Sequence, residues 1–154
     1  MNNRDIPQQP LITTPYFDYG MSKERIKHGR FGDAGYDIYN NSPEDIVIPP
    51  HETKLVPLGF GLKLPYGKAL FQSSRSGHAQ HSLSIGFIPV DSNYTGEIKA
   101  ITTNNSSEPI TIKKDERFGQ FVVLDVYDLD FIDDEPDNHS TDRGDKGFGS
   151  SGKA

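Results

Sequence analysis

The chain has 154 residues, enough for one domain with a sizeable hydrophobic core. Its 15 glycines and 11 prolines argue against long helices, and the absence of cysteine excludes disulfides, thiol catalysis and cysteine-based zinc sites. A formal net charge of −6 argues against a broad nucleic-acid-binding surface, which is usually basic.

The first 30 residues are polar, contain several prolines and show weak hydrophobic periodicity. We interpret residues 1–30 as an N-terminal arm or loosely packed segment. They lack the apolar core of a secretory signal, and no apolar run approaches the roughly 20 residues that a membrane helix needs. We therefore expect no membrane partner and a cytoplasmic or nucleoplasmic location, in a cellular or viral host.

Short apolar runs separated by turn signals begin near residue 45. "GFGLKLP" (59–65) places Phe60, Leu62 and Leu64 on one face, and "EIKAITT" (97–103) alternates in the same way. "RFGQFVVLDVYDLD", from residue 117, is apolar on both faces over its first half, which is typical of a strand buried on both sides. Many short strands at this spacing predict an all-β barrel or sandwich.

Two stretches in the first half could bind phosphate or metal. In "DAGYDIY" (33–39), Asp37 follows an Ala-Gly pair that allows a tight backbone. In "SSRSGHA" (73–79), serines and a glycine surround Arg75, and such hydroxyls and backbone N–H groups can hold phosphate oxygens. A capped turn and a polar surface turn are the structural alternatives.

Two later stretches carry a candidate base and a candidate ligand-binding amide. "VDSNYTGEI" (90–98) places Asp91 three residues before Tyr94, so that a general base could lie beside a stacked ring. In "ERFGQFVV" (116–123), Gln120 interrupts an apolar strand and needs hydrogen-bond partners. The alternatives are an ordinary hairpin turn and a glutamine that satisfies backbone groups.

The acidic run "DLDFIDDEPD" (128–137) predicts a solvated linker. It leads to the glycine-rich tail "DRGDKGFGSSG" (142–152), which has no following helix to form a phosphate loop. The sequence thus divides into the arm at 1–30, a β-rich core at 31–135 and a C-terminal segment at 136–154.

Taken in this order, the five motifs resemble those of the trimeric dUTPase family, over roughly residues 31–152. The resemblance implies a distorted jelly-roll-type β-barrel that forms a homotrimer with shared active sites. It also implies hydrolysis of dUTP to dUMP and pyrophosphate, with Mg²⁺ as the cofactor. Residues 136–154 would then be a mobile lid from one chain over a site formed mainly by the other two.

The same resemblance implies a role for individual residues. Asp91 activates the attacking water, and Asp37 holds waters on the metal. Tyr94 stacks under the deoxyribose, where a 2′-hydroxyl would clash, and Phe148 stacks on uracil. The residues implied to bind phosphate are Arg75, Ser76, Gly77, Gln120, Arg143, Ser150 and Ser151. Those implied to contact base or sugar are Gly86, Pro89, Val90, Tyr94, Lys99, Phe148 and Gly149.

The third motif departs from the family pattern, and two alternatives follow. Ile88 stands where the family usually has glycine, and Pro89 offers no N–H, so a relative with altered base preference, such as for dCTP, is one alternative. The related dCTP deaminases carry a catalytic glutamate ten residues after the position of Asp91; here that residue is Ile101, which disfavours deamination. A nucleotide-binding regulatory protein is the second alternative.

Overall fold

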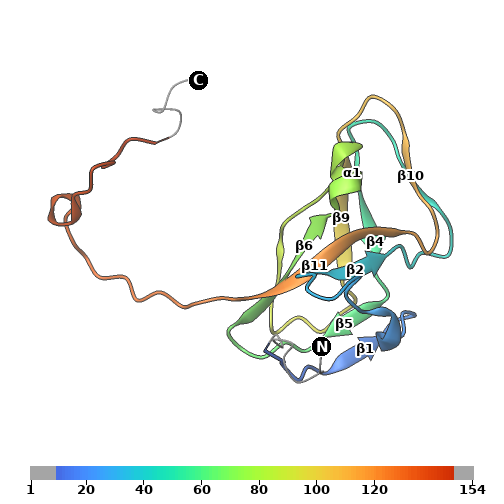
Figure 1. Cartoon of the computed structure of the whole chain (residues 1–154), viewed down its shortest axis with the longest axis horizontal. Coiled ribbons are helices and arrows are strands. Elements are labelled where there is room, and N and C mark those ends of the chain that lie inside the picture. The colour runs from blue at the N-terminus through green and yellow to red at the C-terminus, as the bar shows by residue number, and fades with distance from the viewer. Residues whose placement is uncertain (1–9, 148–154) are drawn as a thin grey trace, which may run out of the picture.

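The computed structural model describes residues 10–147, and Figure 1 shows a β-rich body from which a long C-terminal segment runs away. In that described range the strands are β1 (Tyr16–Asp18), β2 (Tyr36–Tyr39), β3 (Ile46–Ile48), β4 (Thr53–Pro57), β5 (Phe60–Leu62), β6 (Lys68–Ser74), β7 (Leu83–Ile85), β8 (Pro89–Val90), β9 (Lys99–Asn104), β10 (Ile110–Ile112) and β11 (Arg117–Asp125). One short helix, α1 (Ser76–Gln80), and two 3₁₀ turns at Lys23–Arg25 and Pro136–His139 complete the described elements.

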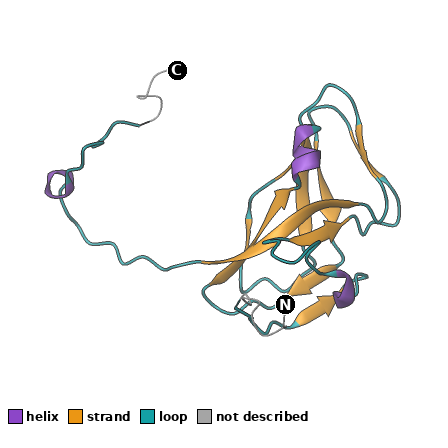
Figure 2. Cartoon of the chain, viewed as in Figure 1, coloured by secondary structure: helices purple, strands orange, loops and turns teal. Residues whose placement is uncertain are grey.

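The strands pair antiparallel in four sheets, in the orders β2-β11-β6-β8, β4-β9-β7, β1-β5 and β3-β10. Strands dominate the body in Figure 2, which confirms the expected all-β fold. The described strands form separate sheets and not one continuously hydrogen-bonded barrel. A side chain joins the two larger sheets: the Ser74 hydroxyl donates to the Leu83 carbonyl (3.2 Å) and accepts from the Ile85 N–H (2.9 Å).

Alternation along β9 follows the sequence pattern. The side chains that point into the core are Ile98, just before the strand, and Ala100, Thr102 and Asn104. Lys99 between them is exposed, as a strand with one buried face requires. The period-2 pattern therefore predicts this strand correctly.

Buried polar side chains fix the turns between strands. The Asn104 amide donates to the carbonyls of Ile48 (2.9 Å) and Glu108 (2.7 Å), and its oxygen accepts from the Ser106 N–H (2.8 Å). Asn40 makes a similar set with Ile112 and Ser42. Buried polar groups require such partners, and these two meet the requirement.

Strand β11 is buried on both faces only over part of its length. Phe118 and Phe121 lie in the core, whereas Leu124 and Asp125 are exposed. The C-terminal end of β11 extends beyond the body, as Figure 1 shows. The prediction of a strand buried on both sides holds for its first half, where the sequence is apolar on both faces.

The N-terminal segment packs on the body from residue 16. Strand β1 pairs with β5, the Tyr16 ring stacks on Phe60 at 5.8 Å between centroids, and Met21 is 1% exposed. Burial raises the pKa of Tyr16 to about 12. These contacts lie within the N-terminal arm or loosely packed segment expected over residues 1–30, and the apolar residues that make them are too sparse to produce a periodic pattern. The domain boundary near residue 30 stays a prediction.

Beyond β11 the chain leaves the body. The Val126 N–H donates to the Gly67 carbonyl (2.9 Å), and the Tyr66 hydroxyl donates to Asp128 (2.6 Å), which raises the pKa of Tyr66. From there to residue 146 every described residue is exposed. No helix in the described range is long and apolar enough to cross a membrane.

Candidate functional site

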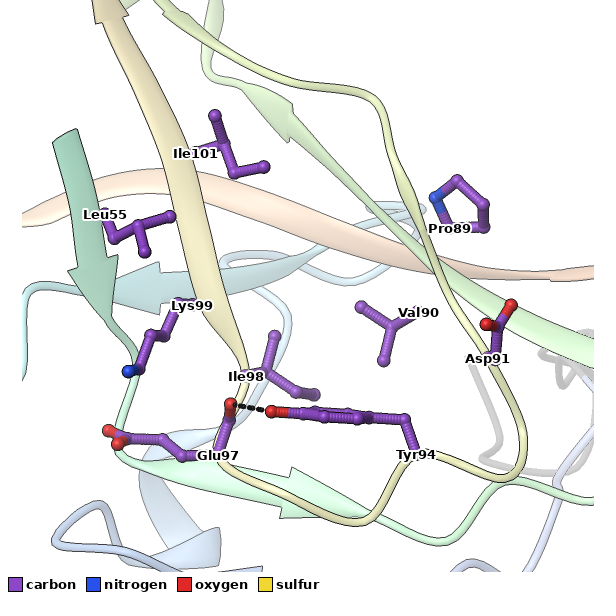
Figure 3. A pocket seen from close by; sticks show the side chains of 9 residues that line it. All are labelled: Leu55, Pro89, Val90, Asp91, Tyr94, Glu97, Ile98, Lys99 and Ile101. Carbon is purple, nitrogen blue, oxygen red and sulfur yellow. Dashed lines mark hydrogen bonds between the residues drawn. The ribbon is translucent and has the colours of Figure 1, made fainter. Parts of the chain in front are cut away.

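A cleft of about 330 Å³ opens beside the turn that follows β8, and Figure 3 shows its side chains. We call it the hairpin cleft. Its lining residues are Leu55, Pro89, Val90, Asp91, Tyr94, Glu97, Ile98, Lys99 and Ile101. Aliphatic side chains from β4, β8 and β9 form one side, and the charged and aromatic side chains lie near the turn. Such a mixture suits a ligand with an apolar ring and a polar end.

Hydrogen bonds within the turn hold the Tyr94 ring in place. The Tyr94 hydroxyl donates to the Glu97 carbonyl (2.8 Å), the dashed contact in Figure 3, and its N–H donates to the Asp91 carbonyl (3.1 Å). A Cβ on Gly96 would lie 2.6 Å from the Tyr94 hydroxyl oxygen, so glycine allows the ring to lie there. The Asp91 carboxylate is exposed at the same turn and is accessible to a water molecule.

A second cleft, of about 460 Å³, lies beside β2 and β11; we call it the arginine cleft. Its lining residues are Gly29, Arg30, Asp33, Ala34, Gly35, Asp37, Arg75, Ser76, Arg117, Gln120 and Val122. Asp37, only 8% exposed, is flanked by Arg117 at 3.0 Å and Arg75 at 3.8 Å. The cleft thus combines three arginines with two carboxylates, which gives it a local positive charge in an acidic protein.

Strand register and a β-bulge bring these groups together. Gln120 lies directly opposite Asp37 in the pairing of β11 with β2. The register shifts between Arg117 and Gly119, and this bulge lets Arg117 line the same cleft as Gln120. Residues three apart on a regular strand would point to opposite faces. Gly35 completes the arrangement, because a Cβ there would lie 2.5 Å from the Gln120 side-chain oxygen.

The donor set suits Mg²⁺ held largely through water. No group of three or more His, Asp or Glu residues that could hold a metal ion occurs in the part of the chain that the structure describes. Mg²⁺ usually keeps several waters and binds through one or two carboxylates together with substrate phosphates. Asp37, which lines the arginine cleft, fits that mode of binding, and the nearby arginines fit the phosphates.

The structure brings the residues predicted from the sequence together in two groups. Pro89, Val90, Asp91, Tyr94 and Lys99 line the hairpin cleft. The predicted residues that line the arginine cleft are Asp37, Arg75, Ser76 and Gln120. The two clefts have no lining residue in common, so Asp91 and the predicted phosphate-binding residues line different clefts of the chain.

The other predicted residues lie elsewhere. Gly77 is in α1, and Gly86 follows β7, where its N–H donates to the Ile101 carbonyl (2.9 Å). Arg143 is exposed in the C-terminal segment, and its Nε donates to the Lys146 carbonyl (2.8 Å). Phe148, Gly149, Ser150 and Ser151 lie outside the described residues.

Sequence reasoning missed several cleft residues. Arg117 stands three positions before Gln120, and only a bulge makes that spacing meaningful. Arg30 has no motif of its own and lies in the arginine cleft because the loop before β2 folds over Asp33, whose carboxylate accepts the Arg30 N–H at 2.8 Å. The combination of glycines and charge in "HGRFGD" (28–33) was the available signal for this loop.

The model of the dUTPase family matches residues 22–152 of this chain. The chain belongs to the dUTPase family. A deoxyuridine 5'-triphosphate nucleotidohydrolase from Fusobacterium nucleatum is 39% identical over 133 residues, which cover 84% of this chain and 90% of that protein. These findings confirm the family, and with it the enzyme class, that the five motifs predict.

Solved dUTPase structures share the fold. The dUTPase of Staphylococcus bacteriophage 80alpha, solved with dUPNHPP, has a TM-score of 0.73 at 25% identity and covers 92% of this chain and 99% of its own. A mutant dUTPase from phage phi11 of S. aureus, described with a structural Mg(II) ion, has a TM-score of 0.69 at 20% identity, covering 80% of this chain and 97% of its own. The second likeness supports the fold alone.

Proposed function

We propose that this chain hydrolyses dUTP to dUMP and pyrophosphate, with Asp91 as the general base. The observation that carries the proposal is the turn at the hairpin cleft, where an exposed carboxylate and a flat tyrosine ring lie three residues apart. A carboxylate that is open to water can take its proton, and an aromatic ring offers a stacking surface for a sugar. Membership of the dUTPase family supplies the substrate class.

The proposed reaction is a single displacement. A water oxygen forms a bond to the α-phosphorus while Asp91 takes the proton of that water. The bond from the α-phosphorus to the bridging oxygen of pyrophosphate breaks, and pyrophosphate leaves with its electron pair. A positioned general base contributes roughly 10²–10⁴-fold to such a step. No covalent enzyme intermediate is required.

The arginine cleft is the proposed triphosphate site. Arg75 and Arg117 present guanidinium groups on either side of Asp37, and Gln120 adds an amide. Guanidinium groups bind phosphate oxygens through paired, charge-assisted hydrogen bonds. Bound Mg²⁺, held by Asp37 through water, would supply charge compensation for the phosphates. Membership of the dUTPase family is the reason for proposing this cofactor.

A homotrimer is the proposed active form. The hairpin and arginine clefts have no lining residue in common, and the C-terminal segment runs away from its own body. Neighbouring copies would place the hairpin cleft of one chain beside the arginine cleft of another. The tail of a third would then bring Arg143 to the γ-phosphate and Phe148 to the base, which is the lid predicted from the sequence.

Altered base preference is the second candidate, and it is favoured by Pro89 in the hairpin cleft and by Ile88 next to it. Pro89 lines the hairpin cleft without an N–H, and Ile88 beside it is 48% exposed. Ile101 lines the same cleft where a deaminase would need a carboxylate, and this argues against dCTP deamination. A regulatory role and a cytoplasmic or nucleoplasmic location stay predictions from the sequence.

A pyrophosphate-release assay with Mg²⁺ against dUTP, dCTP, dTTP and UTP tests the proposal. We expect dUTP to be strongly preferred. Preference for dCTP would overturn the substrate assignment, and release from none of the four would support the regulatory alternative.

The variant Asp91→Asn tests the proposed base, since an amide cannot accept the proton. We expect its turnover to fall about 10²–10⁴-fold while binding of a non-hydrolysable dUTP analogue persists. An Asn variant that keeps most of its activity would exclude Asp91 as the base.

A further inference from the structure

The turn from Asp91 to Glu97 has little regular structure of its own. It lies between β8 and β9, and most of its residues are exposed. An isolated turn of this kind would move more than the strands around it. Yet it carries the proposed base and the ring beneath the sugar. Something outside the turn must therefore hold it in place.

Three side-chain hydrogen bonds connect this turn to the strand pair β1-β5 and the residues that flank it. The Lys63 ammonium donates to the Ser92 carbonyl (3.2 Å), and the Tyr19 hydroxyl donates to the Thr95 carbonyl (3.1 Å). The backbone N–H of Gly59 donates to the Glu97 carboxylate (3.1 Å). The three contacts are spread from the beginning to the end of the turn, so together they restrain both its position and its rotation.

The turn also lies directly on β5. A Cβ built on Gly61 would lie 2.6 Å from the Gly96 carbonyl oxygen and 3.2 Å from that of Thr95. Only a residue without a Cβ allows two backbones to approach this closely. The Tyr19 ring covers the same contact, because its Cε2 would be 3.0 Å from that Cβ.

The supporting strands are fixed to the core. The N–H groups of Tyr19 and Met21 both donate to the Gly59 carbonyl (2.8 and 3.0 Å), and Met21 is buried. Phe60, 1% exposed, stacks with Tyr16 and lies 5.7 Å from the Phe121 ring. A restraint on the turn from this pair of strands is thus a restraint from the core itself.

We infer that Tyr19 and Lys63 are positioning residues that set how strictly the site rejects a ribonucleotide. The inference rests on the proposed dUTP hydrolysis. The hydroxyl end of the Tyr94 ring packs against Gly96, and the Gly96 carbonyl lies against Gly61. The height of the ring therefore depends on the restrained turn. A Tyr94 ring held at a fixed distance from the sugar leaves no room for a 2′-hydroxyl. A ring that can move away from the sugar leaves room for it.

Hydrogen exchange tests the restraint without any need for activity. We expect backbone exchange across residues 92–97 to become about 3- to 10-fold faster in the double variant Tyr19→Phe/Lys63→Met, since each lost hydrogen bond has a modest net worth. Replacing Lys63 by arginine in place of methionine keeps a donor at this position and should restore most of the protection. Lys114→Met removes an exposed lysine at a distant turn and is the matched control. Unchanged exchange in the double variant would overturn the restraint.

Kinetics test the consequence. The ratio of kcat/KM for dUTP to kcat/KM for UTP should fall about 3- to 10-fold in the double variant, mainly because UTP hydrolysis rises. A fold defect would lower both substrates together and leave the ratio unchanged, which would contradict the inference. If the wild-type chain does not hydrolyse dUTP, the proposed function fails, and the exchange experiment still decides whether the restraint exists.

Gly61→Ala provides a second route to the same result. Its Cβ would push against the Gly96 carbonyl, so the turn must shift while Tyr19 and Lys63 remain intact. We expect the same fall in the dUTP to UTP ratio. A folded Gly61→Ala protein with an unchanged ratio would show that the turn is not set by its contact with β5.

Discussion

Single buried side chains determine much of how firmly this fold is held. Asn104, which is fully buried, satisfies three backbone groups that belong to β3, to the following turn and to Ser106. Its neighbour Asn105 is exposed, and the Asn105 side-chain amide donates to the Ser84 hydroxyl (2.9 Å). The two asparagines thus have the same chemistry in opposite surroundings.

Replacing Asn104 by alanine should lower the free energy of unfolding by about 2–4 kcal/mol, because buried carbonyls lose their donors. Urea unfolding at fixed protein concentration measures the change. Asn105→Ala is the control and should cost less than about 1 kcal/mol. Equal losses for the two variants would contradict this account.

Tyr16 gives the stability a pH dependence at alkaline pH. Its pKa is raised from 10.0 to about 12, so the folded chain favours the protonated hydroxyl. This contribution is complete below the unfolded pKa near 10 and is lost as the pH rises toward 12.

Unfolding free energies between pH 10 and 12 should therefore fall more steeply for the wild type than for Tyr16→Phe. The difference between the two proteins isolates this tyrosine from other groups that titrate in the same range. Parallel curves would show that Tyr16 does not contribute.

At the scale of elements, the sequence predicts strands whose residues alternate between buried and exposed. It misses elements that lack this alternation. The alternation at Ile98, Ala100 and Thr102 identifies β9, because one buried face leaves a period of two in the sequence. Strand β1 has three residues and gives no such pattern. The bulge at Arg117 is equally hidden, since it changes which residues share a face without changing composition.

Two core side chains pack directly against a glycine in β11. A Cβ on Gly119 would lie 2.3 Å from the Ile85 side chain and 3.0 Å from that of Ile38. Gly119→Ala should therefore destabilise the fold by about 1–3 kcal/mol through overpacking. Thermal unfolding measures this against Gly77→Ala, where a Cβ meets nothing within 4 Å. A Gly119→Ala protein as stable as the control would show that the neighbouring core side chains can rearrange to accommodate the added methyl group.

At the scale of the whole molecule, the motifs predict candidate site residues, and the structure places these residues in two clefts of one chain. Asp91 and Gln120 come from different turns and strands, and nothing in their order shows the distance between them. The types of the predicted residues in each cleft indicate the chemistry of that cleft. Completion of the proposed site by neighbouring copies is an expectation from the family resemblance alone.

Mixing two inactive variants tests the shared site. Asp91→Asn and Arg143→Ala trimers should each be nearly inactive, yet unfolding and refolding them together should restore part of the dUTPase activity. Some mixed trimers would then contain a site with both residues intact. The control is the same mixture without refolding, which should stay inactive. No recovery from a refolded trimer would show that Asp91 and Arg143 act from one chain.

Removing residues 141–154 tests the tail. We expect a folded trimer by light scattering and a dUTP hydrolysis rate at least about tenfold lower, because closure excludes water and completes the site. Full activity after truncation would remove the tail from the mechanism.

The exposed stretch from 127 to 146 is also a tether. A short linker keeps an attached segment at a local concentration on the order of millimolar, whatever the concentration of enzyme in solution. The proposed lid would then close through weak contacts, and weak contacts would break soon after the reaction. In the proposed trimer, the length of this acidic stretch would adjust the balance between capture of substrate and escape of product, without any change in the residues that touch either one.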